Sequence, residues 1–379
     1  MFCSNCGKKI SESAKFCRYC GFPQELDEDF TQEKNIPPPP KDEVPKKETL
    51  HSDTDTAPAA TTKENRKIKN IPAILLSIIF IAGIILSPIL IPWLSKKNDG
   101  KVIIDGIIYK FNDASKDYYV YDVEDPNLIE ANIVSYIKDY PVTSIGHKTI
   151  SGFNVTFENC KNLTNITIPS TITSIGSYAF RFCESLETIE IPNSVQSIGF
   201  GAFEWCKSLI SITIPEGVIE ISSSAFEFCL SLEEVNLPST IKKIGSSAFE
   251  SCESLVKINL TEGIESIGVR AFCDCISLTE IYLPDTITHI DRLAFFDCEK
   301  LQSLRIPKNI ITIPEYMACN CKFSSVYIPK SVTTIEKYAF GYNSPDIYYE
   351  GTREQWENIV IEEGNQFLKT EKIFLNSYY

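Results

Sequence analysis

The chain has 379 residues and a formal net charge of −14 at pH 7. The first hundred residues carry 14 Lys and Arg against 13 Asp and Glu, whereas the remainder carries 22 against 37. The acidic remainder argues against nucleic acid, or any other anionic polymer, as its main partner, although an acidic surface is also a common route to solubility.

Residues 1–21 contain two Cys-x2-Cys pairs, each followed by a glycine. Four thiolates at this spacing predict one tetrahedral zinc site, because so short a segment has no other core. The predicted ligands are Cys3, Cys6, Cys17 and Cys20. The loop between the pairs is shorter than in most related sites, but the segment resembles the small bacterial zinc-ribbon family. Two redox-active pairs are the alternative, although no thioredoxin-like pattern surrounds them.

Residues 22–70 are expected to be a disordered linker, since they contain a proline run and little that can be buried.

Residues 71–94 contain no charged residue. As a helix they would extend for about 36 Å, enough to cross a hydrocarbon core of about 30 Å. We therefore predict a single transmembrane helix, and not a cleaved signal peptide, because about 70 residues precede it.

Basic residues flank this segment on both sides, with Arg66, Lys67 and Lys69 before it and Lys96 and Lys97 after it. The positive-inside rule therefore leans only slightly toward a cytoplasmic N-terminus. Zinc thiolates persist best in a reducing compartment, which favours the same orientation. We predict a single-pass protein of the cell membrane with the repeats described below outside the cell. The many cysteines of that region argue for the opposite orientation unless they are well buried.

Residues 101–139 contain short strand-like runs, two of them on either side of Asp105-Gly106. A solenoid needs an atypical end to cover its first coil, so we predict an N-terminal cap here. Residues 343–379 are the corresponding C-terminal cap. There, Thr352 and Gln355 have the spacing of a capping box, which predicts a short helix. Trp356 and Ile359 would cover the last coil.

Residues 140–342 repeat with a period of 23, which is typical of a leucine-rich solenoid. Leucines and isoleucines hold the same step, and in each unit they alternate as in a strand that a proline ends. An Ala-Phe pair is expected in a helical turn beneath that strand. The cysteine column is Cys160, Cys183, Cys206, Cys229, Cys252, Cys275, Cys298 and Cys321. The phenylalanine column is Phe157, Phe180, Phe203, Phe226, Phe249, Phe272 and Phe295.

The cysteine column places like residues at equivalent points of adjacent coils, about 4.8 Å apart. Neighbours could therefore be close enough to crosslink, but the pattern is not that of a small disulfide-stapled domain. We predict buried free thiols that pack as small hydrophobic side chains.

The unit CxxLxxIxIPxxVxxIGxxAFxx, as in residues 183–205, resembles the BspA-like (treponemal-type) leucine-rich repeat family. The resemblance implies an α/β solenoid, that is, a right-handed superhelix of about eight 23-residue repeats with a parallel sheet on its concave side. The pattern departs from the family late, where Pro314, Met317 and Ala318 replace the expected Gly, Ala and Phe. Members of the family are implicated in adhesion and in contacts with a host or community.

No nucleophile motif, phosphate-binding glycine loop or HExxH motif occurs in the sequence, so we do not expect an enzyme. The best candidate site is the outward-facing side of the strands, because Tyr and Arg are enriched in binding hot spots. Its candidate residues are Glu234, Glu280, Tyr282, Arg305 and Tyr327. An ordinary polar sheet face is the alternative.

We therefore predict a membrane-anchored surface recognition protein whose repeats bind a protein or glycan outside the cell. The alternative is a transmembrane sensor or scaffold whose cytoplasmic zinc ribbon binds a protein or nucleic acid. Nucleic acid is the weaker choice, since the ribbon has few basic residues beyond Lys8, Lys9, Lys15 and Arg18. An envelope scaffold without a specific ligand is a third reading.

Overall fold

The computed structural model describes residues 100–146, 148–149, 152–153, 156–341, 345–369 and 373–376. The predicted zinc ribbon, linker and transmembrane helix all lie outside these residues. Within the described part of the chain, no helix has the length and apolar character needed to span a bilayer.

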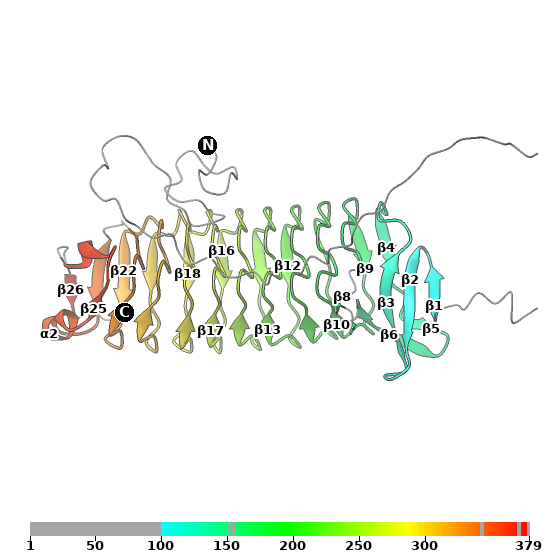
Figure 1. Cartoon of the computed structure of the whole chain (residues 1–379), viewed down its shortest axis with the longest axis horizontal. Helices are drawn as coiled ribbons and strands as arrows, with labels where there is room; N and C mark the ends of the chain where they lie inside the picture. The colour runs from blue at the N-terminus through cyan, green and yellow to red at the C-terminus, as the bar shows by residue number, and fades with distance from the viewer. Residues whose placement is uncertain are drawn as a thin grey trace, which may run out of the picture. The chain divides into compact units, whose positions relative to one another are not determined.

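The repeats stack as a parallel β-solenoid of about 11 turns, and the turns contribute short strands to two rows (Figure 1). The first row consists of β4 (Glu130–Asn132), β9 (Asn165–Thr167), β12 (Ser211–Thr213), β14 (Glu234–Asn236), β16 (Lys257–Asn259), β18 (Glu280–Tyr282), β20 (Ser303–Arg305), β22 (Ser325–Ile328), β24 (Asp346–Tyr349) and β26 (Ile373–Leu375). The second row consists of β6 (Tyr140–Ile145), β10 (Ser174–Ile175), β11 (Ser197–Ile198), β13 (Glu220–Ile221), β15 (Lys243–Ile244), β17 (Ser266–Ile267), β19 (His289–Ile290), β21 (Thr312–Ile313), β23 (Thr334–Ile335) and β25 (Val360–Ile361).

Parallel pairing joins equivalent residues of successive turns, as the sequence period requires. In the first row Ile258 of β16 lies opposite Ile281 of β18, one period of 23 residues later. Toward the C-terminal end the step changes, since Arg305 pairs with Tyr327 and Ile347 with Ile373. The predicted repeats of 23 residues are thus the regular centre of a longer stack, and turns of other lengths extend it at the ends.

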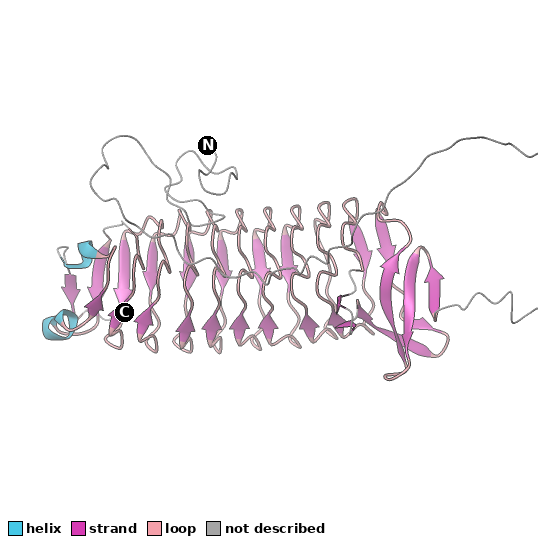
Figure 2. Cartoon of the chain, viewed as in Figure 1, coloured by secondary structure: helices cyan, strands magenta, loops and turns pink. Residues whose placement is uncertain are grey.

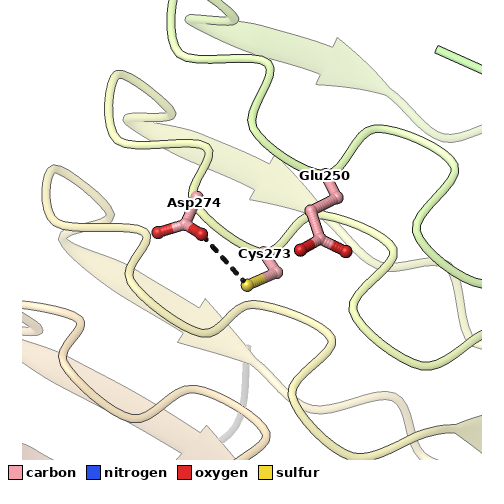
Figure 3. Close-up of side chains that lie close together, drawn as sticks. All are labelled: Glu250, Cys273 and Asp274. Atoms are coloured by element: carbon pink, nitrogen blue, oxygen red, sulfur yellow. Dashed lines mark hydrogen bonds between the residues drawn. The ribbon is translucent and has the colours of Figure 1, made fainter. Parts of the chain in front are cut away.

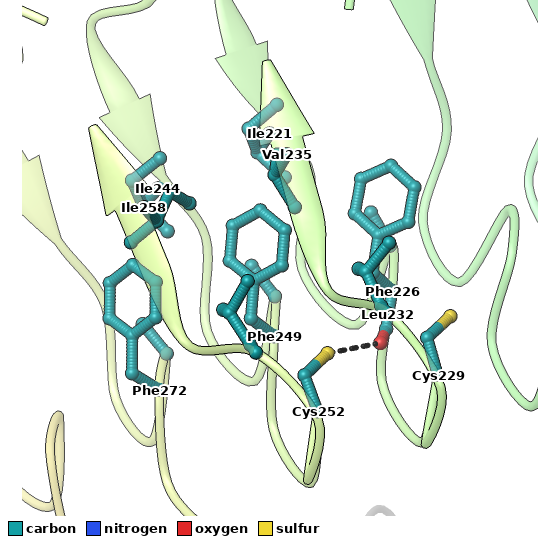
Figure 4. Close-up of a cluster of buried hydrophobic side chains, with 14 of the residues drawn as sticks. Ile221, Phe226, Cys229, Leu232, Val235, Ile244, Phe249, Cys252, Ile258 and Phe272 are labelled. Carbon is teal, nitrogen blue, oxygen red and sulfur yellow. Dashed lines mark hydrogen bonds between the residues drawn. The ribbon is translucent and has the colours of Figure 1, made fainter. Parts of the chain in front are cut away.

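The interior contains a continuous column of phenylalanine rings. All seven rings from Phe157 to Phe295 are fully buried, and neighbours stack with centroids 5.2–5.5 Å apart. Figure 4 shows three of them, Phe226, Phe249 and Phe272, beneath the strands. The column breaks at Ala318, where the neighbouring Met317 is the larger buried side chain. The strand spacing of a sheet is close to the stacking distance of rings, so one residue type can repeat indefinitely at this position.

The Ala-Phe segments form turns, so the predicted helical turn was wrong. Two residues in each of these segments have left-handed backbone, for example Tyr178 (φ 59°) and Phe182 (φ 60°). A right-handed helix cannot include such residues. The backbone N–H of Phe180 donates instead to the carbonyl of Ala202 in the next turn, at 2.8 Å. Among the described residues the repeats are therefore built of strands and turns, and the fold is a β-solenoid in place of the α/β solenoid predicted.

The ten described cysteines are all free and buried, as predicted. Seven of them donate their S–H to the carbonyl of a phenylalanine in the preceding turn, as Cys252 does to Phe226 at 3.3 Å (Figure 4). Burial raises the pKa of the Cys252 thiol well above its ordinary value. The pKa of Cys160, at the edge of the column, is raised to about 12 for the same reason. These thiols are packing groups with a satisfied hydrogen bond.

The N-terminal end is an antiparallel meander of β1 (Lys101–Ile104), β2 (Ile107–Asn112) and β3 (Asp117–Val123). Strand β3 then pairs in parallel with β6, which joins the meander to the second row. Two small hairpins lie nearby: β5 (Tyr136–Ile137) pairs with β6, and β7 (Lys148–Thr149) pairs with β8 (Gly152–Phe153). The strands predicted on either side of Asp105-Gly106 are confirmed.

The C-terminal end contains the two helical segments of the described chain, α2 (Arg353–Glu357) and the 3-10 helix η1 (Gln366–Lys369) (Figure 2). The predicted capping box is present: the backbone N–H of Gln355 donates to the Thr352 hydroxyl at 3.3 Å, and that of Thr352 donates to Gln355 Oε1 at 2.9 Å. Trp356 is buried and packs edge-on against Tyr349 with centroids 5.1 Å apart. The helix thus brings an aromatic side chain against the penultimate turn.

Candidate functional site

The first strand row presents alternate side chains to solvent. In β16 and β18 the central Ile258 and Ile281 are buried and their flanking residues are exposed. We call the last outward position of these strands the outer column. It consists of Asn132, Thr167, Thr213, Asn236, Asn259, Tyr282, Arg305, Tyr327, Tyr348 and Phe374.

The outer column changes character along the solenoid. Up to Asn259 its strand residues are small and polar, and the equivalent position of the turn that lacks a strand here is the exposed Glu190. The next five turns present only aromatic rings and an arginine. We call these five residues the aromatic row: Tyr282, Arg305, Tyr327, Tyr348 and Phe374. The sequence period identified the first three but missed Tyr348 and Phe374, which follow after the 23-residue step is lost. Aligning the apolar Ile347 with Ile373 would have found them.

The rings at the C-terminal end of the aromatic row stack on one another. The Tyr327 and Tyr348 centroids lie 4.8 Å apart with an interplanar angle of 22°, and Tyr348 and Phe374 lie 4.8 Å apart at 15°. Both faces of the Tyr348 ring are therefore covered, so its edge and hydroxyl are what a ligand can reach. Phe374 and Tyr282 have 41% and 55% of their surface exposed. Such a surface offers apolar edges and phenol hydroxyls, and few open ring faces.

Arg305 is held rigidly within this row. Its Nη1 and Nη2 donate to the two carboxylate oxygens of Asp285 at 3.0 and 3.1 Å. These hydrogen bonds lower the pKa of Asp285, and Lys308 Nζ lies 3.7 Å from the same carboxylate. A bidentate pair fixes the guanidinium plane, so little conformational entropy remains to be lost when a ligand binds.

The other candidate residues have partners of their own. The Tyr282 hydroxyl donates to Glu262 at 3.4 Å, and Glu280 forms an exposed ion pair with Lys257. Glu234, in β14, accepts a hydrogen bond from Asn236 at 2.9 Å. The structure thus places Tyr282, Arg305 and Tyr327 on three successive turns, and Glu234 two turns before them. Their role in binding a ligand stays a prediction.

A second cluster lies inside the turns. Glu250, Cys273 and Asp274 are buried, and their ligand atoms lie within 4.8 Å of one another (Figure 3). Arg270 donates to Glu250 from Nη2 at 2.6 Å and from Nε at 2.9 Å. The guanidinium therefore supplies a positive charge at the place that a cation would take, and we assign this cluster a structural role.

Two family models match this chain. The model of the BspA type leucine rich repeat region matches residues 142–255 and 219–345 with 6 copies. A zinc-ribbon domain model matches residues 2–24, which include all four predicted zinc ligands. A search of curated proteins found no match.

Three solved structures are similar. A leucine-rich repeat protein of T. pallidum is 28% identical over 53% of this chain and 90% of its own, with a TM-score of 0.48. One from Bacteroides ovatus is 25% identical over 73% and 68%, with a TM-score of 0.48. A leucine rich cell surface protein of Faecalibacterium prausnitzii is 22% identical over 70% and 98%, with a TM-score of 0.35. The two matched ranges of the repeat model together span more than half of the chain, which therefore belongs to the family of proteins with a BspA type leucine-rich repeat region.

Proposed function

We propose that this protein is a membrane-anchored surface recognition protein whose solenoid binds a protein partner through the aromatic row. The observation that carries the proposal is the change along the outer column from small polar residues to Tyr282, Arg305, Tyr327, Tyr348 and Phe374. Aromatic residues and arginine are the side chains that contribute most to protein–protein interfaces. Nothing in the packing of the solenoid requires them at a solvent-facing position.

The ring geometry favours a protein over a glycan as the ligand. A sugar ring binds to an open aromatic face, and here neighbouring turns cover both faces of Tyr348. Stacked edges and hydroxyls suit apolar side chains and backbone carbonyls of a polypeptide. The stack and the Asp285–Arg305 pair also preorganise the surface, which lowers the entropic cost of binding.

Photo-crosslinking from the outer column tests this proposal in intact cells with the full-length protein. A crosslinking amino acid at Tyr282 should capture a distinct partner, whereas the same group at Thr213, three turns earlier in the same column, should not. The Tyr348→Ala substitution should reduce capture at position 282. Equal capture at both positions would contradict the proposal, and capture that glycosidase treatment abolishes would favour a glycan.

The anchor and the location belong to the same proposal. We propose that residues 71–94 span the cell membrane once, with the zinc ribbon in the cytoplasm and the repeats outside. The apolar length of that segment supports a membrane span. The slight excess of basic residues before it, and the zinc thiolates that persist best in a reducing compartment, support this orientation. Protease treatment of intact cells should then remove an epitope at the C-terminus and spare one at the N-terminus. We propose no catalytic activity.

A second function, that of a transmembrane sensor or scaffold, is favoured by the zinc-ribbon match. Cys3, Cys6, Cys17 and Cys20 offer four thiolates, the donor set of a structural Zn²⁺ site. In this reading the ribbon binds a cytoplasmic protein, with nucleic acid the less favoured partner. Deleting residues 1–21 separates the two functions, because a protein that acts only in adhesion should keep the crosslink at position 282.

A further inference from the structure

The described part of the solenoid begins close to the predicted membrane span. The apolar segment ends at Leu94, and β1 begins at Lys101, seven residues later. Seven residues extend to at most about 25 Å. If residues 71–94 cross the bilayer, the start of β1 therefore stays within about 25 Å of the hydrocarbon core. Whatever lies at that point of the N-terminal cap is held near the membrane surface.

The start of β1 belongs to one edge of the N-terminal cap. There β3 and β6 also begin, and β2, which is antiparallel to β1 and β3, ends. The turn from β2 to β3 and the turn from β5 to β6 lie at the same edge. We call the lysine and aromatic side chains at this edge the cap rim, which consists of Lys101, Lys110, Phe111, Lys116, Lys138 and Tyr140. The tether thus joins the solenoid at the cap rim.

The aromatic residues of the cap rim form a cluster that reaches the surface. The Phe111 ring centroid lies 5.0 Å from that of Tyr118 and 5.0 Å from that of Tyr140. Tyr118 is buried beneath, whereas Tyr140 has 40% of its surface exposed. Lys116 Nζ lies 5.9 Å from the Phe111 ring centroid. Tyrosines, and lysines with their long apolar stems, are side chains that suit the interface of a bilayer.

The other lysines of the cap rim lie at the same edge. Lys101 and Lys110 are cross-strand partners, and their Nζ atoms lie 4.9 and 5.0 Å from the Tyr121 ring centroid. The acidic Asp105 and Asp122 belong to the opposite edge of the meander, where β1 and β3 end. The positive charge of the meander is therefore gathered at the edge that the tether reaches.

The cap rim differs in charge from the solenoid as a whole. The chain after its first hundred residues carries 22 Lys and Arg against 37 Asp and Glu. At the cap rim, four lysines stand against Asp113, Asp117 and Asp139. Asp113 pairs with Lys116 at 3.3 Å, and Asp117 accepts a hydrogen bond from the Thr143 hydroxyl at 2.6 Å. A bilayer that contains anionic lipids repels an acidic surface, so the rim, without an excess of negative charge, is the part suited to approach it.

We propose that the cap rim docks on the surface of the membrane that residues 71–94 span. The inference rests on the proposed anchor, and it holds for either orientation of the chain. The lysines contact lipid phosphate groups, while Phe111 and Tyr140 enter the boundary between headgroups and acyl chains. Because the tether makes this contact intramolecular, a weak affinity is enough to maintain it. Docking then fixes the direction in which the solenoid leaves the membrane, with the aromatic row at its other end.

Photo-crosslinking to lipid tests the docking with the full-length protein in intact cells. The cells are grown with radioactive phosphate, p-benzoylphenylalanine replaces Tyr140, and phospholipid adducts are measured on the purified protein against a sample kept in the dark. Phe200, with 39% of its surface exposed, is the matched control away from the cap. Ile129, 62% exposed and directly before β4, is the control at the same end of the solenoid but beside the first strand row (Figure 1).

Phospholipid should crosslink several times more strongly at position 140 than at 129 or 200. Equal labelling at 140 and 129 would mean that the tether alone brings the cap near the membrane, and it would overturn the proposal. A crosslink at 140 to another protein in place of phospholipid would also overturn it.

Charge substitutions test the part that the lysines play. Lys101→Gln with Lys110→Gln should lower phospholipid labelling at position 140 about fivefold or more. Lys242→Gln with Lys243→Gln removes two exposed lysines from the centre of the solenoid and should leave the labelling unchanged. Equal effects of the two pairs, or no effect of the first, would count against docking by the cap rim.

Extraction of the same membranes with alkaline carbonate separates this inference from the anchor on which it rests. Protein that stays in the membrane but gives no labelling at position 140 refutes the docking alone. Protein that carbonate releases refutes the anchor, and the docking with it.

Discussion

The most direct test of the packing is the substitution Phe226→Ala at the centre of the phenylalanine column. Phe226 is fully buried, and its ring lies 5.4 Å from Phe203 and 5.4 Å from Phe249. Loss of the ring removes about 1.5–3 kcal/mol of burial free energy, and each of two ring stacks contributes about 0.5–1.5 kcal/mol. Hydrogen bonds to the turns on both sides keep the cavity from collapsing. We expect a loss of about 4 kcal/mol, typical of buried Phe→Ala changes.

The measurement is denaturant unfolding followed by far-UV circular dichroism, together with hydrogen exchange of the backbone in residues 203–252. Hydrogen exchange is needed because a stack of turns can unfold in parts, and a single midpoint then underestimates a local loss. Tyr282→Ala, at an exposed position, is the control and should change stability by less than about 0.5 kcal/mol. A loss at Phe226 below about 1 kcal/mol would refute the account of the core.

The chain also offers its own compensating variant. Where Ala318 interrupts the column, Met317 replaces the usual alanine beside it, so the larger side chain moves by one position. The double substitution Ala225→Met with Phe226→Ala copies this pair. It should recover at least about 1 kcal/mol of the single-substitution loss, because Met fills irregular gaps. If the double variant is no more stable than Phe226→Ala alone, the two residues at 317 and 318 do not compensate each other.

Burial, followed by the charge of Glu250, raises the pKa of Glu227 to about 7, so the folded protein holds a proton that the unfolded chain releases near pH 4.5. This group therefore makes the protein less stable as pH rises from about 4.5 to 7, a loss of about 3 kcal/mol that Glu227→Gln should remove. A variant whose stability falls with pH as steeply as that of the parent would contradict this. A thiol reagent should label the repeat cysteines only after denaturation, because burial raises the pKa of the thiols and blocks access of the reagent. Rapid labelling of the folded protein would show that the stack of turns opens. The purified protein should contain one zinc ion per chain by elemental analysis, lost on Cys17→Ser, and a full complement of metal in that variant would exclude Cys17 as a ligand.

The period of 23 residues was enough to predict the stack, the phenylalanine column and the buried thiols. Each of these depends only on which residues recur at one step, and parallel pairing then places them side by side. The capping box at Thr352 was predictable for a similar reason, since its two hydrogen bonds require only a fixed local spacing. Because the thiols are buried, they are no longer an argument against placing the repeats in an oxidising compartment.

The conformation of the turns could not be predicted in the same way. Phe182 and Trp205 have positive φ because the turn must reverse direction there. Aromatic residues do not favour left-handed backbone, so the sequence gives no sign of this conformation. The helical turn was predicted because Ala and Phe suit a helix locally, but hydrogen bonds to the neighbouring turn take the place of helical ones. Tyr348 and Phe374 were missed because the spacing changes where the aromatic row ends.

The hydrogen bonds between turns have a mechanical consequence. They run along the axis of the stack, so a pull between the two ends of the solenoid puts the same tension on every junction between turns, and the junctions break one at a time. A released turn of 23 residues can extend to about 75–80 Å. With a tether before the first strand and a ligand bound by the last turns, the protein would lengthen under tension in discrete steps while the ligand stays bound.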